Sequence, residues 1–191
     1  PYKHATEIFA AQLSVLGVHV LDYELSAPAV DAQSAACADS FLKSHGITPD
    51  QKLVLVNPNA GELCRERRWP PACFAELIAR MVERNAGLRV ILVGAPVDRE
   101  VVREVYDLLP EEARKRTVSS AGVLGIRALI ALINRCTLFV SNDSGPLHLA
   151  VAAKVPTVSF FGPESPALYG PRDDRHTVFF ADIYCSPCLN V

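Results

Sequence analysis

The sequence of 191 residues has no apolar run long enough to cross a membrane. Its first residues also lack the basic start and the apolar core of a secretory signal peptide. Lysine and arginine do not outnumber the acidic residues, and the formal net charge of −2 provides no general attraction for nucleic acid. We therefore expect a cytoplasmic protein that does not bind nucleic acid.

Several motifs of common enzyme classes are also missing. There is no G-x-x-x-x-G-K-[ST] motif, which argues against a P-loop nucleotidase. No G-x-G-x-x-G follows the first predicted strand, so the dinucleotide-binding fingerprint is absent. The chain has no G-x-S-x-G elbow either, which disfavours acyl transfer by a serine nucleophile.

Cysteine is scattered, apart from one C-x-x-C pair formed by Cys185 and Cys188. A structural zinc site needs four ligands, and this pair supplies two. We expect these cysteines to bind metal only if two further ligands follow residue 191, and we expect no metal elsewhere. Because the chain begins without methionine and stops just after the pair, we also expect a fragment of a longer protein.

The composition that remains is that of a globular protein, since 50% of the residues are hydrophobic and 21% are charged. Helical spacing of apolar residues predicts helices at 5–16, 30–45, 74–84, 97–109, 126–134 and 149–153. Short apolar runs predict strands at 18–21, 53–56, 89–94, 117–118, 137–141, 157–162 and 177–180. Strands that alternate with helices in this way predict an α/β fold with a Rossmann-like, doubly wound parallel sheet.

The alternation begins only after residue 47. We expect residues 1–47 to form the end of a neighbouring N-terminal domain and an inter-domain connector, and residues 48–191 to form the sheet domain.

The most informative stretch is S-N-D-S-G-P-L-H at 141–148, between a predicted strand and a predicted helix. Free backbone N–H groups and the positive end of a helix dipole at such a turn bind anions. A purely structural interpretation also fits, because Asp143 or Ser144 can cap the helix and Pro146 suits its first turn. Capping does not account for His148, whose ring can donate to a phosphate oxygen. Both interpretations stay open from spacing alone.

Residues after the other strands can complete such a site, because the carboxyl ends of parallel strands meet at one edge of the sheet. The small residues at 57–61 allow close approach of the backbone to a phosphate, and the arginines at 65–68 supply positive charge. Asp98, after the strand at 89–94, is placed either to accept hydrogen bonds from ribose hydroxyls or to cap the next helix.

Together these pieces resemble the C-terminal half of glycosyltransferase family 9, the heptosyltransferases of lipopolysaccharide core synthesis. The matching motifs, in family order, are N-P-N-A-G at 57–61, R-R-W-P at 67–70, G-A at 94–95 with Asp98, N-D-S-G-P-L-H-L-A at 142–150, Pro156, F-G-P at 161–163 and C-S-P-C at 185–188. The Asp-Ser-Gly-x-x-His element that starts at Asp143 is the most specific of them.

The resemblance implies the C-terminal domain of a GT-B glycosyltransferase, which binds a nucleotide sugar, usually ADP-heptose. The implied donor-binding residues are Asn59, Asp98, Leu124, Asp143, Ser144, Gly145 and His148. Ser144, Gly145 and His148 would face the diphosphate. Asp98 would hold the ribose, and the adenine would lie near Leu124.

Arg67 stands two residues before Trp69, where the family commonly has lysine, and would offset charge on the leaving diphosphate. The implied reaction inverts the anomeric carbon, as a carboxylate deprotonates a hydroxyl of a lipopolysaccharide-core or other glycan acceptor. The resemblance places that general base in the N-terminal domain, and it implies no cofactor and no metal. We therefore expect this chain to bind the donor without turnover, either free in the cytoplasm or at the cytoplasmic face of the inner membrane.

Two other functions remain open at this point. One is a non-catalytic module that binds a nucleotide sugar, and the other is a different GT-B enzyme such as a nucleotide-sugar epimerase. An acidic residue in a glycine-rich loop upstream of this chain would favour transfer, and its absence would favour the binding module.

Overall fold

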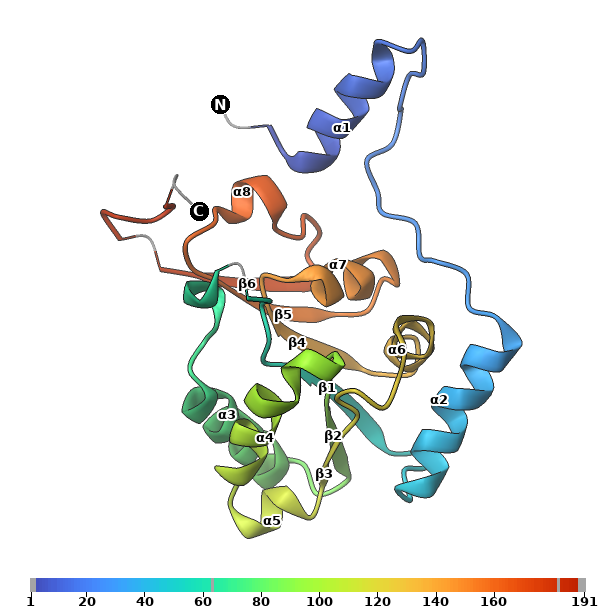
Figure 1. The fold of residues 1–191 in the computed structure, drawn as a ribbon, viewed down its shortest axis with the longest axis vertical. Helices are drawn as coiled ribbons and strands as arrows, with labels where there is room; N and C mark the ends of the chain where they lie inside the picture. Colours follow the sequence, from blue (N-terminus) through green and yellow to red (C-terminus); the bar gives the residue numbers. More distant parts are fainter. Residues whose placement is uncertain (1–2, 63, 182, 189–191) are drawn as a thin grey trace.

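A single parallel sheet forms the centre of the molecule in a computed structural model, which describes residues 3–62, 64–181 and 183–188 (Figure 1). Its six strands stand in the order β3-β2-β1-β4-β5-β6. They are β1 (Lys52–Asn57), β2 (Leu88–Leu92), β3 (Thr117–Ser119), β4 (Leu138–Asn142), β5 (Thr157–Phe161) and β6 (His176–Phe180). All five neighbouring pairs are parallel, which confirms the predicted doubly wound sheet.

The strand order reverses between β1 and β4. The chain runs outward from β1 through β2 to β3, and then returns to β4 and continues outward on the other side. In the shared register Asn57, at the end of β1, lies opposite Ser141 of β4. The loops that leave these two strands turn to opposite faces of such a sheet, and a crevice for ligands opens between them.

Helices cover both faces of the sheet. Figure 1 shows α3 (Pro71–Arg84), α4 (Arg99–Asp107) and α5 (Glu111–Arg114) on one face, and α2 (Ala32–Ser44), α6 (Ile126–Ile133) and α7 (Gly145–Ala152) on the other. Two short helices, α1 (Ala5–Ser14) and α8 (Pro166–Tyr169), and two 3₁₀ turns, η1 (Arg65–Arg67) and η2 (Pro96–Asp98), complete the described elements.

Successive residues of β1 enter two different cores, as the period of a strand requires. Val54 and Val56 pack with α3 and α4, whereas Leu53 and Leu55 pack with α2 and α6. Because both faces are buried, the strand reads in the sequence as a continuous apolar run rather than as an alternating one.

The segment before α2 differs from the prediction. The strand expected at 18–21 is wrong, because residues 18–31 form no helix or strand, and we call them the connector. Leu21 is 95% exposed there and finds no neighbouring strand to complete a ladder. The run Val18-His19-Val20-Leu21 has the composition of a β-strand. It forms no strand because a strand also needs a neighbouring strand to pair with.

The other differences are local. The helix predicted at 97–109 begins as the 3₁₀ turn η2, and α5, α8 and η1 were not predicted because a single turn carries no hydrophobic period. The helix α2 contributes Ala38 and Phe41 to the same core as Ile47, so it packs on the sheet domain. The domain boundary expected after residue 47 stays a prediction.

No helix in the described part of the chain combines the length and the apolar character needed to cross a bilayer.

The burial of the core predicts how much stability is lost when one of its large side chains is truncated. Phe139 of β4 is fully buried, so Phe139→Ala should lower the free energy of unfolding by about 3–5 kcal/mol. Phe9→Ala is the matched control, because Phe9 on α1 is 62% exposed and should lose little. Denaturant unfolding followed by circular dichroism measures both. Equal effects of the two changes would contradict this description of the core.

Candidate functional site

A cavity of about 470 Å³ opens where β1, β2 and β4 end, and we call it the edge cavity. Its walls come from residues 57–61 after β1, 93–98 after β2 and 144–146 at the start of α7. The loop into α6 adds an apolar wall through Leu124 and Ile126. The cavity therefore lies at the reversal of strand order, where ligands bind in open α/β sheets.

Two asparagine side chains tie these loops together. The amide of Asn57 donates to the hydroxyls of Ser141 (3.0 Å) and Ser144 (2.9 Å). The amide of Asn59 donates to Oδ1 of Asn57 and to the carbonyl of Val93, both at 3.0 Å. One connected hydrogen-bond network thus fixes the ends of β1, β2 and β4 relative to one another.

Ser144 is the N-cap residue of α7, but its hydroxyl does not cap the helix. It accepts from Asn57 instead. Within the described residues the N–H of Gly145 has no hydrogen-bond partner, and a Cβ on Gly145 would meet no atom within 4 Å. The serine side chain therefore does not cap this turn, and the first amide of α7 is left without a partner among the described residues, as an anion site requires.

Two buried polar atoms at the site lack partners among the described residues. Asn59 is only 4% exposed, yet its Oδ1 accepts no hydrogen bond. The Nε of Arg67 is likewise buried without an acceptor. Such atoms are rare in native proteins, so both mark polar groups near the cavity whose hydrogen bonding is incomplete.

Asp143 lies behind this cavity and is only 5% exposed. Burial raises the pKa of Asp143, while Arg67 and His148 act in the opposite direction. Nη1 of Arg67 lies 3.8 Å from Oδ2 of Asp143. Burial also lowers the pKa of His148, against the attraction of Asp143, so the neutral imidazole is favoured.

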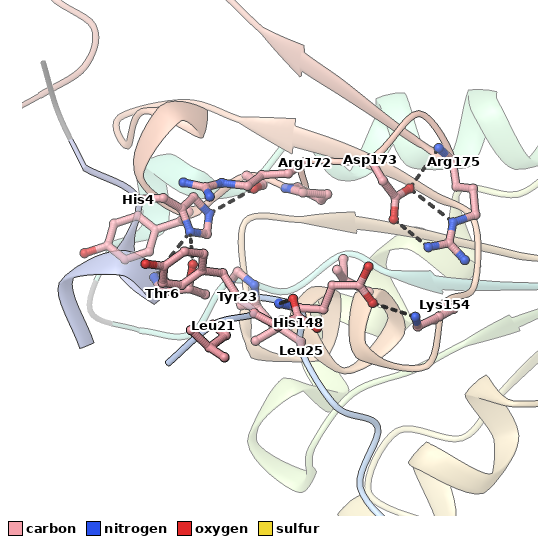
Figure 2. A pocket seen from close by; sticks show the side chains of 16 residues that line it. His4, Thr6, Leu21, Tyr23, Leu25, His148, Lys154, Arg172, Asp173 and Arg175 are labelled. Carbon is pink, nitrogen blue, oxygen red and sulfur yellow. Dashed lines mark hydrogen bonds and ion pairs between the residues drawn. The ribbon is translucent and has the colours of Figure 1, made fainter. Parts of the chain in front are cut away.

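His148 does not line the edge cavity. It lines a second cavity of about 320 Å³, the connector cavity, between the connector and α1 on one side and α7 with the loop before β6 on the other (Figure 2). The first turn of α7 thus contributes to two neighbouring cavities, with Gly145 at one and His148 at the other.

Comparison with known proteins decides the family. Residues 6–191 match the sequence model of glycosyltransferase family 9 (heptosyltransferase). The chain belongs to glycosyltransferase family 9. Lipooligosaccharide heptosyltransferase 2 of Haemophilus influenzae is 33% identical over 147 residues, which are 77% of this chain and 42% of that relative. This family 9 chain therefore spans less than half the length of that curated relative.

Solved structures of family 9 proteins share the fold. A family 9 glycosyltransferase from Veillonella parvula superposes with a TM-score of 0.78 at 28% identity, over 95% of this chain and 50% of that one. The ADP-heptose lipopolysaccharide heptosyltransferase II of E. coli gives a TM-score of 0.69 at 26% identity, over 80% of this chain and 44% of that one. The Rossmann-like domain expected for a GT-B glycosyltransferase is thus confirmed.

Most of the predicted site residues meet at one place. The edge cavity brings together Asn59, Arg67, Asp98, Leu124, Ser144 and Gly145. Asp143 stands beside it through its approach to Arg67, and His148 faces the connector cavity. The residues that the family resemblance assigned to donor binding thus lie close together. The role of each of them stays a prediction.

The structure separates two arginines that the sequence left equivalent. Nη2 of Arg68 donates to the carbonyl of Gly61 and to Glu62, both at 2.6 Å, so Arg68 braces its own loop. Arg67 lines the edge cavity. Asp98 lines the cavity but does not cap α4, since its side chain makes no cap bond to that helix and its Oδ2 accepts from the N–H of Ala95 at 2.8 Å. Its role toward a ribose stays a prediction.

Three residues that shape the site lie in motifs quoted from the sequence, which assigned them no role of their own. Asn57 is the centre of the hydrogen-bond network. Asn142, fully buried, accepts from the N–H of Trp69 and donates to the carbonyl of Pro58, both at 2.9 Å. A Cβ on Gly94 would come within 2.9 Å of Asn59 Nδ2. The available signal was an asparagine at the last position of an apolar strand, where a buried amide needs partners.

The cysteine pair gives no further support for a metal. Cys185 and Cys188 are free and exposed, and the described residues contain no group of three or more histidine, cysteine or acidic side chains that could hold a metal ion. Zinc binding with further ligands after residue 191 stays a prediction.

The buried carboxylate predicts a pH dependence. Between the ordinary pKa of about 3.9 and the raised pKa of Asp143, the folded state holds more protons than the unfolded chain. The free energy of unfolding therefore falls as pH rises through that window. Asp143→Asn removes this titration, so the variant should gain stability relative to the parent as pH rises above about 4 in denaturant unfolding.

Asp173→Asn is a control in which the effect of pH on stability should have the opposite sign. Arg175 holds the pKa of Asp173 down to about 2, so this carboxylate contributes stability above its ordinary pKa and loses it as pH falls. A pH profile of Asp143→Asn that runs parallel to the parent profile would contradict the burial of an ionisable group at residue 143.

Proposed function

We propose that this chain binds the nucleotide part of an ADP-sugar, by analogy with its relatives ADP-heptose, in the edge cavity. The longer protein would act as an inverting glycosyltransferase that adds the sugar to a lipopolysaccharide-core acceptor. The name of the E. coli structural relative supports the choice of donor, and the family supports the type of reaction.

One observation carries the proposal. Gly145, whose N–H has no hydrogen-bond partner among the described residues, and Arg67 line the same cavity. A helix N-terminus and an arginine together form a site for the two charged groups of a diphosphate. The hydroxyl of Ser144 lies at the same edge.

The rest of the cavity suits a nucleoside. Asp98 provides a carboxylate that can accept from ribose hydroxyls, and Asn59 also lines the cavity. Leu124, Ile126 and Leu129 form an apolar wall against which a base can pack. Gly94 leaves the space that a side chain would close.

In the proposed reaction an acceptor hydroxyl attacks the anomeric carbon as the bond to the diphosphate breaks. Arg67 and the α7 amides would stabilise the negative charge that develops on the leaving diphosphate, and we assign no metal or cofactor to that step. We assign the general base to no residue of this chain, because Asp98 accepts from Ala95 and Asp143 lies buried beside Arg67. The chain should therefore bind the donor without turnover. A lipid-borne acceptor would bring the longer protein to the inner membrane.

Titration calorimetry with ADP, AMP and UDP tests the proposal. Arg67→Ala should weaken ADP binding by about 1.5–3 kcal/mol and AMP binding by less, because the charge faces the distal phosphate. Arg80→Ala is the matched control, since Arg80 pairs with Glu76 on the exposed side of α3 and should leave binding unchanged.

Three outcomes would count against parts of this proposal. Folded protein that binds neither ADP nor UDP would refute the nucleotide site. A preference for UDP over ADP would indicate a UDP-sugar rather than an ADP-sugar as the donor. Equal weakening of ADP and AMP in Arg67→Ala would move Arg67 away from the distal phosphate.

A further inference from the structure

Residues 64–69 include Arg67, which lines the edge cavity, and we call them the Arg67 loop. They lie between β1 and α3 and contain the 3₁₀ turn η1. Nearly all of their described hydrogen bonds join residues within 61–68, such as the bond from Nη2 of Arg68 to the carbonyl of Gly61 at 2.6 Å. These bonds stiffen the loop, but they do not fix its position on the sheet.

One hydrogen bond joins this loop to the sheet within the described residues. The backbone N–H of Trp69 donates to Oδ1 of Asn142 at 2.9 Å. Asn142 is the last residue of β4 and is fully buried, and its Nδ2 donates to the carbonyl of Pro58 at 2.9 Å. A buried amide whose oxygen and nitrogen are both bonded is held in one orientation, so it fixes the point at which the loop meets the sheet.

The ring of Trp69 provides a second contact. It stacks on Phe160 of β5 with ring centroids 4.2 Å apart, and it packs in a T-shaped arrangement against Phe74 of α3 at 5.1 Å. Phe74 is fully buried. Aromatic pairs of this kind are worth more than the area they bury, so the ring is held between the sheet and the helix. We call the Asn142 bond and this aromatic contact together the anchor.

The position of Arg67 depends on the anchor. Arg67 is two residues before Trp69, and its side chain forms no hydrogen bond within the described residues. Its Nη1 lies 3.8 Å from Oδ2 of Asp143, which is too far for a hydrogen bond. The backbone of the loop, rather than a side-chain bond, therefore sets where the guanidinium lies.

The neighbouring loop at 57–61 has contacts of its own. The amide of Asn59 donates to Asn57 and to the carbonyl of Val93, both at 3.0 Å. Loss of the anchor should therefore displace Arg67 more than it displaces Asn59. This difference separates a positioning role from a general loosening of the cavity.

We infer that Asn142 and Trp69 are positioning residues that hold Arg67 at the distal phosphate of a bound nucleoside diphosphate. Neither residue needs to touch the ligand, because the anchor acts through the backbone of the loop. A displacement of about 1 Å is enough to weaken a contact that depends on geometry. The inference rests on the proposed function, since that function supplies the phosphate.

Titration calorimetry with ADP and AMP tests the inference in Asn142→Ala. The change should weaken ADP binding about tenfold, because the charge-assisted contact of Arg67 is lost, and AMP binding by less than about twofold. In an Arg67→Ala background it should weaken ADP no further, since it acts through Arg67. Thr117→Val is the matched control. Thr117 of β3 is 2% exposed and its hydroxyl donates to the carbonyl of Ala113, so its loss should leave both affinities unchanged.

Fluorescence provides a measurement that needs no ligand. Trp69 is the only tryptophan of the chain, so its emission reports on the anchor. In folded Asn142→Ala we expect emission at longer wavelength and stronger quenching by acrylamide than in the parent, because the ring leaves its stack on Phe160. Thr117→Val should emit like the parent.

Two changes at Trp69 test the anchor with Asn142 in place. Trp69→Leu removes the aromatic stack, so it should weaken ADP binding about tenfold and leave AMP binding nearly unchanged. Trp69→Phe keeps an aromatic ring against Phe160 and should retain most of the affinity for ADP. These variants decide the question if Asn142→Ala does not fold.

The inference is overturned if folded Asn142→Ala keeps the emission of the parent, if it weakens ADP and AMP equally, or if it weakens ADP further when Arg67 is replaced by alanine. It is also overturned if Trp69→Leu keeps the affinity of the parent for ADP. Weaker ADP binding in Arg67→Ala but in neither anchor variant would refute the inference alone and leave the proposed function standing. A parent that binds neither nucleotide would refute the proposed function and the inference with it.

Discussion

The side-chain amide of Asn57 is the contact on which the edge cavity depends. Asn57 is the last residue of β1 that pairs with β4. Its amide donates to the hydroxyls of Ser141 and Ser144 and so connects loops that otherwise diverge. Because Ser144 is occupied in this way, its hydroxyl does not cap α7. A buried amide thus leaves the helix N-terminus open, which stabilises the loops at the cost of the ordinary cap.

The charges around this network follow from the same geometry. The turn that opens α7 also buries Asp143, and burial raises its pKa although Arg67 is near. A carboxylate in such a position destabilises the free protein when it ionises. Arg67 can serve both Asp143 and an incoming phosphate, because a guanidinium presents several donors in a plane. The site therefore contains groups whose interactions are incomplete within the described residues, as binding sites often do.

The sequence predicted the sheet, and it singled out most of the residues that line the edge cavity, because these features depend on local patterns. Apolar runs such as 53–56 and 137–141 are buried on both faces and needed only their composition to be recognised. The strand predicted at 18–21 failed because pairing depends on a neighbour that the local sequence does not specify. For the same reason the sequence grouped His148 with Ser144 and Gly145, although the connector forms a separate cavity around its ring.

The helix α7 has only eight residues, too few to be stable by its own propensity. Its position is set by Leu147 and Ala150, which are fully buried in the domain, and its small side chains allow close approach to β4 and β5. Chemistry that depends on positioning needs groups held by packed elements of this kind. Gly145 and His148 both belong to α7. A change in the core that moves this helix therefore moves the walls of both cavities together. The spacing between the edge cavity and the connector cavity is then a property of the core rather than of the loops.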